Sequence, residues 1–346
     1  MVLGADGVHS RTRQAMQSLA AGGSGDEDRP SPFVTTYRAL LGNVGAPLPG
    51  LPPGSNYEGA ADGVSTQVLT ATGRAWFAVY EALEGGPTPR RRRWTAADAD
   101  AVLARWGHLY AAPGYTVNQI RALADASGDG GAGPLGLISL EEGLLDTWWW
   151  RRIVLVGDAV RKLEPHAGLG YNAGVSDLAE LVNGLRALTA ASTALPPTTA
   201  DLEALFAAYQ ARRAGDSPAL TSMSARRARL CAWLGPHHWL VARFAVPWLP
   251  LARRAAERVL GPLLARAPVL AWLPERRLPA RAVPYLHHPR LGGDDGNDND
   301  NNNNNSSKRS SVEAATPLLL LRLPLFAGAV VFATLATVGV RFYRRV

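Results

Sequence analysis

A short run of consecutive apolar residues, Ile153–Val156, constrains the fold of this chain more than any other feature. Runs of this kind are typical of a strand that is buried on both faces of a sheet. The run stops at Gly157-Asp158, and a glycine-rich stretch follows. Apolar residues then recur at three- and four-residue steps, which predicts a helix that starts near Gly174. These residues are Val175, Leu178, Leu181, Val182, Leu185 and Leu188.

The turn between this strand and this helix is the predicted cofactor site, because ligands of open α/β sheets bind beyond the carboxyl ends of the strands. Asp158 can accept hydrogen bonds from ribityl hydroxyls, and Gly168 and Gly170 let the backbone approach a flat ring. The helix start offers N–H groups and partial positive charge to the pyrimidine edge of a reduced flavin. The alternative is an ordinary strand-turn-helix unit, since a Gly-Asp pair alone is a weak signal.

The segment Ile153–Asn172 resembles the second FAD motif of the aromatic-hydroxylase-like FAD-dependent monooxygenases. The matching residues are Ile153–Val160, Pro165, Gly168–Gly170 and Asn172. The resemblance implies that the aspartate contacts the ribityl chain, that the proline lies near the reacting edge of the ring, and that the Gly-x-Gly-x-Asn stretch lines the isoalloxazine. The cofactor-binding residues expected from it are Asp158, Pro165, Gly168, Leu169, Gly170, Tyr171 and Asn172.

A second stretch, Gly4–Arg13, resembles the Asp-Gly motif of the same family. The resemblance implies that Asp6, Gly7 and Arg13 bear on the FAD diphosphate and on the nicotinamide cofactor. The alternative is a plain turn that opens a helix, with Asp6 and Ser10 as caps.

Between the two motifs, β-type runs separated by Gly and Pro turns predict a sheet over Phe33–Gly42 and Val64–Val79, and Ala96–Tyr110 is expected to be helical. Val34–Gly42 resembles the strand that opens the substrate-facing sheet in fungal relatives that act on terpenoids. Tyr37 is therefore the candidate catalytic residue, as a substrate-side hydroxyl. The alternative, a tyrosine packed on the sheet because of its β propensity, is favoured by the residue type.

The predicted fold class is α/β (α+β), with an incomplete FAD-binding Rossmann-like domain, a β-sheet substrate domain, C-terminal helices and one transmembrane helix. The expected parts are a remnant of the FAD-binding domain (1–25), a β-rich substrate domain (30–147), the Gly-Asp motif with its helix (148–190), a helical region (200–290), a disordered linker (291–315) and a transmembrane helix (318–340). In the helical region, helices are expected at Asp201–Gly215 and Met223–Leu234.

The nearly continuous apolar segment 318–340 is long enough to cross a hydrocarbon core of roughly 30 Å. We expect a single-pass C-terminal membrane anchor with the catalytic body in the cytosol. The alternative is a buried core helix.

Composition excludes several other classes. Cys231 is the only cysteine, so neither an internal disulfide nor a cysteine-based zinc site is possible, and no metal is expected. The net charge of +7 comes from short arginine runs without a nucleic-acid-binding motif, so no nucleic-acid partner is expected.

For the complete protein, the resemblance implies an enzyme in which NAD(P)H reduces FAD, reduced flavin reacts with O2, and one oxygen atom is transferred to the substrate. The anchor favours a lipophilic, terpenoid-like substrate that is hydroxylated or epoxidised in secondary metabolism. Relatives begin with a Gly-x-Gly-x-x-Gly strand-turn-helix that is missing here, so we expect an N-terminally truncated chain. The alternatives are a flavin-dependent reductase of the same fold and a non-catalytic, membrane-tethered remnant.

Overall fold

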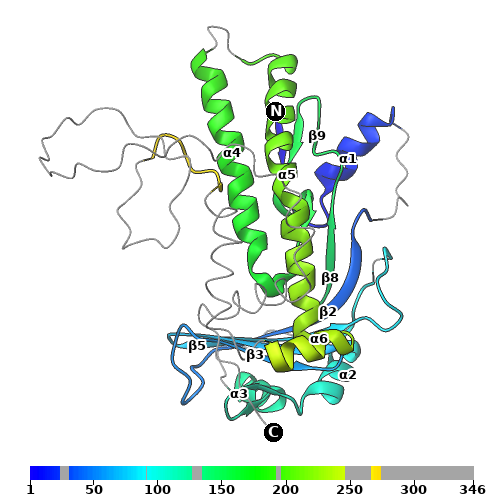
Figure 1. The fold of residues 1–346 in the computed structure, drawn as a ribbon, viewed down its shortest axis with the longest axis vertical. Helices are drawn as coiled ribbons and strands as arrows, with labels where there is room; N and C mark the ends of the chain where they lie inside the picture. Colours follow the sequence, from blue (N-terminus) through cyan, green and yellow to red (C-terminus); the bar gives the residue numbers. More distant parts are fainter. Residues whose placement is uncertain (24–30, 91, 127–134, 192–195, 246–265, 274–346) are drawn as a thin grey trace, which may run out of the picture.

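The computed structural model describes residues 1–23, 31–90, 92–126, 135–191, 196–245 and 266–273 (Figure 1). These residues form a mixed α/β fold, as the sequence predicts. A small sheet with long helices lies at one end, and a larger antiparallel sheet with short helices lies at the other (Figure 1).

The small sheet joins the N-terminal strand to two strands from the middle of the chain. Its strands are β1 (Val2–Gly4), β10 (Ile153–Leu155) and β9 (Trp149–Trp150), in the order β1-β10-β9. The strands β1 and β10 are parallel, with Leu3 opposite Val154. Parallel pairing requires a crossover connection, and here five of the six strands of the larger sheet (β2, β3, β4, β5 and β8) lie in that connection.

Three helices surround the small sheet: α1 (Arg11–Ala20), α4 (Leu169–Ala191) and α5 (Thr199–Cys231). The long helices α4 and α5 lie side by side (Figure 1). The apolar core between these elements includes Met16, Trp148, Val154, Leu155, Leu181, Phe206 and Tyr209.

The larger sheet has six strands in the order β11-β8-β2-β5-β4-β3, and every neighbouring pair is antiparallel. The strands are β2 (Val34–Val44), β3 (Asn56–Ala61), β4 (Val64–Ala71), β5 (Arg74–Ala82), β8 (Gly136–Leu144) and β11 (Arg161–Lys162). A separate two-stranded ladder consists of β6 (Tyr110–Ala112) and β7 (Tyr115–Thr116).

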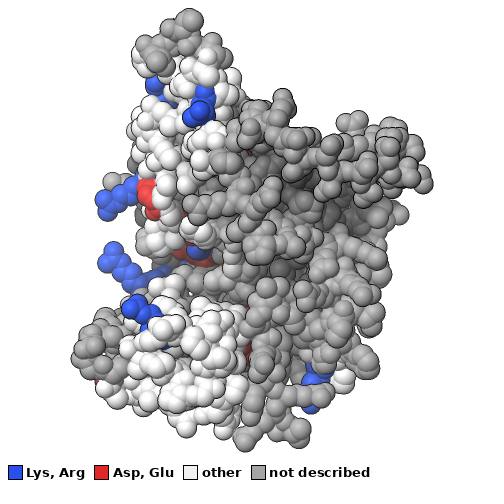
Figure 2. All heavy atoms as spheres, turned by 90° about the vertical axis from the view of Figure 1, so that its left-hand side faces the viewer, with Lys and Arg blue, Asp and Glu red and all other residues white. Residues whose placement is uncertain are grey.

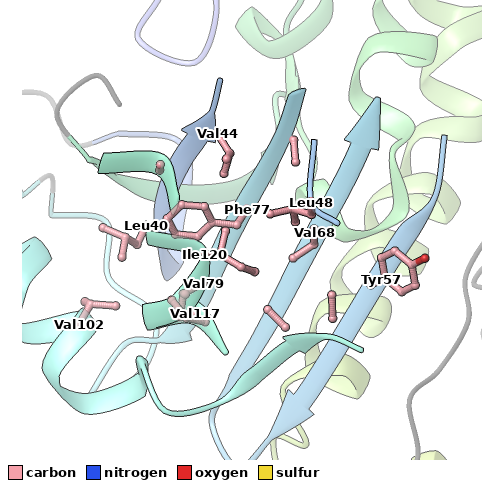
Figure 3. Packing of buried hydrophobic residues seen from close by; sticks show 14 of the residues in the cluster. Leu40, Val44, Leu48, Tyr57, Val68, Phe77, Val79, Val102, Val117 and Ile120 are labelled. Atoms are coloured by element: carbon pink, nitrogen blue, oxygen red, sulfur yellow. The ribbon is translucent and has the colours of Figure 1, made fainter. Parts of the chain in front are cut away.

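Two helices, α2 (Ala96–Trp106) and α3 (Val117–Ala126), cover one face of the six-stranded sheet. Their buried side chains pack on alternate residues of the strands, and Figure 3 shows Ile120 of α3 among Phe77 and Val68 of the sheet. The opposite face carries a smaller cluster that includes Tyr37, Tyr80 and Ala228. The end of α5 therefore packs on the sheet face opposite α2 and α3.

The expected β-runs are confirmed as β2, β4 and β5. The helix expected over Ala96–Tyr110 is present as α2 but ends at Trp106, and Tyr110 begins β6. The start of α4 was predicted wrongly, because the helix begins at Leu169 and not near Gly174. Gly168 has a left-handed backbone with φ +64°, which ends the preceding 3-10 turn and allows the helix to begin at once.

The apolar face predicted for α4 is only partly buried. Leu181 is buried, whereas Val175, Leu178 and Val182 are between 37% and 45% exposed. The helix instead turns Ala173 and Asp177 inward, because a polar side chain with buried partners can occupy an inward position that periodicity assigns to an apolar residue.

The two helices expected at Asp201–Gly215 and Met223–Leu234 are one helix, α5. It continues through Pro218, whose ring lies on an exposed position. Proline removes only one helical hydrogen bond, so packing at both ends of the helix can outweigh its cost. A short helix, α6 (Pro236–Leu240), and a π-helical turn, Val241–Ala245, follow α5.

The predicted linker (291–315) and transmembrane helix (318–340) lie outside the described residues. Among the helices that are described, none combines the length and the apolar character needed to span a bilayer. The same part of the chain contains no group of three or more His, Cys, Asp or Glu side chains arranged to hold a metal ion.

Candidate functional site

The two motifs lie side by side at the carboxyl ends of β1 and β10. The Val156 backbone N–H donates to the Gly4 carbonyl oxygen at 3.0 Å, which continues the parallel ladder past the end of β10. Arg13 links the motifs further, because its Nη1 donates to the carbonyl oxygen of Ala159 at 3.0 Å. Residues that are far apart in sequence thus form one turn region.

Asp6 and Ser10 form a cap at the start of α1. The Asp6 carboxylate accepts hydrogen bonds from Ser10 Oγ at 2.5 Å and from the Thr12 backbone N–H at 3.0 Å, while Ser10 Oγ accepts from the Arg13 backbone N–H. Partial burial alone would raise the pKa of Asp6, but the hydrogen bonds from Ser10 and Thr12 lower it to about 2. Gly7 lies in the turn with φ +79°. Asp6 and Ser10 thus cap the start of α1, as the alternative interpretation of this motif expects.

Arg13 is buried, and its guanidinium is directed at backbone carbonyls. Besides Ala159, it donates to the Val8 carbonyl oxygen at 2.7 Å and lies 4.9 Å from the centre of the Phe33 ring. Burial lowers the pKa of Arg13, against the opposing effect of nearby Glu141. In this arrangement Arg13 fixes the position of the turn that follows β10.

The Gly157-Asp158 turn packs closely against α4. Gly157 has φ +60°, and a Cβ at Gly174 would lie 3.6 Å from its Cα. The distance is an ordinary van der Waals contact, so the positive φ of Gly157 is the feature that requires glycine in this turn. The Asp158 side chain is 33% exposed, and its Oδ2 accepts from Lys162 Nζ at 2.5 Å.

The loop that follows presents the remaining predicted residues at the surface. Pro165 opens the 3-10 turn η2 (Pro165–Ala167) and is exposed, and Gly168 ends it. Tyr171 is 81% exposed, and the Asn172 side-chain amide donates to the Gly168 carbonyl oxygen at 3.2 Å. Leu169 and Gly170 are partly exposed in the first turn of α4. The structure brings Asp158, Gly168, Leu169, Gly170, Tyr171 and Asn172 to the start of one helix.

A buried ion network beneath the turn was missed by the sequence analysis. Asp177 of α4 accepts from Arg161 Nη2 at 2.9 Å, from Arg213 Nε at 2.9 Å and from the Gly157 backbone N–H at 3.0 Å. Its side chain is fully buried. The only signal in the sequence is an acidic residue among the apolar residues of α4.

Tyr37 lies in the interior of the larger sheet, on the face that the end of α5 covers. It is 1% exposed, its hydroxyl has no hydrogen-bond partner among the described residues, and its ring centre lies 5.9 Å from that of His166. Burial raises the pKa of Tyr37 far above its ordinary value, and Glu164 raises it further. The hydroxyl therefore stays protonated at neutral pH. The sequence analysis did not single out Glu164 or His166.

The geometry at the start of α4 fits an extended polar cofactor with a flat ring. The first N–H groups of a helix lack intrahelical acceptors and carry partial positive charge. Oδ1 of Asp158 points toward Gly170, since a Cβ at Gly170 would lie 3.8 Å from that oxygen. A Cβ at Gly168 would meet no atom within 4 Å, so the approach to this helix end is open.

Other surface features lie away from this region. A cavity of about 420 Å³ is lined by residues such as Thr35, Glu84, Arg90 and Trp94 and by none of the motif residues. On the face drawn in Figure 2, Lys and Arg side chains of the described residues are spread over separate places rather than gathered in one patch.

Comparisons with known proteins agree with the geometry. The model of the family described as FAD binding domain matches residues 81–209. The FAD-dependent monooxygenase srdH of Neurospora crassa is 31% identical over 275 residues, which cover 77% of this chain and 60% of that protein. The FAD-dependent monooxygenase pyr5 of Aspergillus fumigatus is 31% identical over 261 residues, which cover 72% of this chain and 53% of that protein.

One solved structure, a salicylate hydroxylase substrate complex, has the same fold. It aligns with a TM-score of 0.51 and 20% identity, covering 78% of this chain and 64% of that chain. The chain spans between 53% and 60% of the length of the two curated relatives named above.

Proposed function

Because the chain belongs to the FAD-dependent monooxygenases that contain the FAD binding domain, we propose that it forms the flavin-edge and substrate-side part of such an enzyme. The proposed reaction uses NAD(P)H and O2 to hydroxylate or epoxidise a lipophilic, terpenoid-like substrate. The observation that supports it most directly is the parallel pairing of β1 with β10, which brings both motifs to the carboxyl ends of these two strands.

FAD, when bound, supplies the redox chemistry by taking electrons from NAD(P)H and activating O2. The chain's own residues bind and orient it. Asp158 Oδ1 would accept a hydrogen bond from a ribityl hydroxyl, because Oδ2 is already paired with Lys162. The N–H groups at the start of α4 would attract the electron-rich edge of the ring. Gly168 and Gly170 would leave room for the ring.

Tyr37 has one feasible role in this proposal. Since burial keeps its hydroxyl protonated, Tyr37 acts as a hydrogen-bond donor on the substrate side and not as a base. A packed tyrosine without a substrate contact is the alternative, and replacing it by phenylalanine distinguishes the two. If Tyr37 orients the substrate, Tyr37→Phe lowers the yield of oxygenated product per NAD(P)H consumed.

The lipophilic substrate class and the membrane location belong to the same proposal. The apolar segment 318–340 supports both parts of the proposal, because a membrane anchor would keep the catalytic part of the chain beside a bilayer. Flotation of the expressed full chain with lipid vesicles tests this location. Recovery of the chain only in the lipid-free fraction would remove the argument for a lipophilic substrate.

A flavin titration tests the proposed function directly. The full chain is expressed and titrated with FAD while the flavin fluorescence and absorbance spectrum are recorded. We expect saturable binding that Asp158→Asn weakens about tenfold, which corresponds to the loss of a charge-assisted hydrogen bond of about 1.4 kcal/mol. The matched control is Asp62→Asn, at an exposed turn between β3 and β4, which leaves binding unchanged.

A protein that shows no spectral change at any FAD concentration would overturn the proposal for this polypeptide and would favour the non-catalytic alternative. If the chain binds FAD and oxidises NAD(P)H, ¹⁸O₂ separates a monooxygenase from a reductase. Only a monooxygenase transfers the label to its product.

A further inference from the structure

The loop before α4 buries two titratable side chains that the proposed function does not use. Glu164 is 0% exposed and His166 is 9% exposed, although their neighbour Pro165 is at the surface. Both side chains contact residues of the larger sheet on the face that α5 covers. They therefore connect the loop that carries Pro165 and Gly168 to the substrate-side sheet.

Glu164 contacts both of the elements that hold the loop in place. Its Oε1 accepts a hydrogen bond from Thr36 Oγ1 of β2 at 2.6 Å. Its backbone oxygen accepts from Ser224 Oγ of α5 at 2.5 Å. The loop is thus attached to the sheet and to the helix at the same residue.

His166 is enclosed by aromatic rings of the sheet. Its ring centre lies 4.3 Å from that of Tyr80 and 5.9 Å from that of Tyr37. Its Nε2 lies 3.1 Å from Ser65 Oγ of β4. This contact leaves Nδ1 as the nitrogen that faces Glu164.

Each of these two residues has one buried polar atom without a hydrogen-bond partner among the described residues. The atoms are Glu164 Oε2 and His166 Nδ1, and they lie 3.8 Å apart. Leaving both unpaired is costly, because each has lost its contact with water. A displacement of about 1 Å brings them within the 2.7–3.2 Å range of a hydrogen bond.

The surroundings decide which atom holds the proton. Burial raises the pKa of Glu164 to about 7, and the charge of Glu142 also raises this pKa. The hydrogen bond from Thr36 and the charges of Arg229 and Lys162 act in the opposite direction and lower it. Burial lowers the pKa of His166 to about 3, and the charge of Arg227 lowers it further. Below neutral pH the carboxyl group is thus a donor and the imidazole is a neutral acceptor.

We propose that Glu164 and His166 form a positioning pair in which protonated Glu164 donates to His166 Nδ1 and His166 Nε2–H donates to Ser65. The pair holds the loop of Pro165 and Gly168 against the substrate-side sheet, and so fixes the floor of the flavin site; this last step rests on the proposed function. When Glu164 releases its proton to solvent, the donor is lost, the carboxylate lies unpaired beside His166, and the loop is held less firmly.

The sign of the pH dependence follows from the two shifts. The pKa of folded Glu164 lies above its ordinary 4.5, so its contribution to stability is fully present below pH 4.5 and is lost as the pH rises through about 7. The pKa of folded His166 lies below its ordinary 6.5, so its contribution is present above pH 6.5 and is lost as the pH falls toward 3. Between pH 4.5 and 6.5 the two contributions therefore change in opposite directions and largely cancel.

Two measurements on the full chain without flavin test the pair. In ¹⁵N spectra of the histidine side chains, we expect His166 at pH 6 to be a neutral imidazole with the proton on Nε2. In thermal unfolding from pH 5 to 8, we expect the two opposite contributions to keep the wild-type Tm nearly level up to about pH 6.5 and to lower it slightly above that pH. Glu164→Gln keeps a donor at all pH values and retains only the contribution of His166, so its Tm rises from pH 5 to 6.5, whereas His166→Phe lowers Tm throughout.

The control is Glu84→Gln, because the Glu84 side chain is 81% exposed and its replacement leaves the profile parallel to that of the wild type. A proton on Nδ1, or a His166 that titrates near 6.5, would overturn the pair even if Glu164→Gln failed to fold. Parallel profiles for the wild type and Glu164→Gln would also overturn it. Because neither measurement uses flavin, these outcomes are independent of the FAD titration.

Discussion

At the scale of single residues, Asp177 is a fully buried carboxylate that pairs with two arginines. Its fully buried carboxylate is shared by Arg161, Arg213 and the Gly157 backbone N–H. Removal of one member of a buried charge network leaves the others unpaired in a medium of low polarity. The position of the Gly157-Asp158 turn therefore depends on Asp177, which is not one of the predicted cofactor-binding residues.

We expect Asp177→Asn to lower the free energy of unfolding by about 3–5 kcal/mol, measured by urea denaturation. The control is Glu180→Gln on the same helix, since Glu180 pairs with Arg212, which is 71% exposed. That change costs about 0–1 kcal/mol, because exposed ion pairs contribute little. If both variants lost the same free energy of unfolding, the buried network would contribute no more to stability than the pair of Glu180 and Arg212.

The glycines at the start of α4 give a second prediction at this scale. Gly168 has φ +64°, so Gly168→Ala strains the backbone by about 1–2 kcal/mol even though its Cβ meets no atom. Gly170 has ordinary helical geometry, so Gly170→Ala stabilises the free chain by about 0.5 kcal/mol. In the FAD titration, however, Gly170→Ala weakens binding, because its methyl group projects toward Asp158. If Gly170→Ala left the FAD affinity unchanged, the flavin ring would not lie beside Gly170.

At the scale of elements, α5 begins with a capping box. Thr198 Oγ1 accepts from the Asp201 backbone N–H, and the Asp201 carboxylate accepts from the Thr198 backbone N–H. This helix connects the small sheet to the larger one, so fraying at its start affects the core around Phe206.

We expect Thr198→Ala to destabilise the chain by about 1 kcal/mol, as removal of an N-cap does. Thr189 of α4 is the matched control, because its hydroxyl is exposed and, among the described residues, bonds to carbonyl oxygens of its own helix. Thr189→Ala is expected to be neutral or slightly stabilising, since alanine has the higher helix propensity. The comparison is made by thermal unfolding at one pH, and a loss at Thr189 as large as at Thr198 would contradict the capping argument.

At the scale of the whole molecule, two apolar cores are joined by elements that pass through both. Leu144 of β8 packs on the core of the small sheet, whereas Leu137 of β8 packs on the core beneath α2 and α3. The helix α5 contributes Phe206 to the first core and Ala228 to the cluster on the other face of the larger sheet. This continuity predicts that the described parts unfold together.

We expect Ile120→Ala in one core and Phe206→Ala in the other to shift the same calorimetric transition, each by about 2–5 kcal/mol. Both side chains are 0% exposed, so the two changes are comparable. Two separate transitions, each sensitive to only one of the variants, would show that the cores are independent.

Much of the local structure could be predicted from the sequence, because its causes are local. The apolar run before Gly157 and the β-type runs between Gly and Pro turns each involve residues within a few positions of one another. Their strands β10, β4 and β5 were predicted correctly, and the cap at Ser10, which was the alternative for the first motif, is present. The same locality explains the errors, since the left-handed Gly168 and the continuation of α5 through Pro218 depend on what packs against them.

The sequence by itself determined the elements and the strand-turn-helix that resembles a flavin motif, since periodicity and turn chemistry act over short distances. Only the tertiary structure decided that β1 pairs with β10, that Arg13 links the two motifs, and that Glu164, His166 and Asp177 are buried. The physical reason is that the free energy of a buried polar side chain depends on partners brought from distant parts of the chain, and no short pattern contains them.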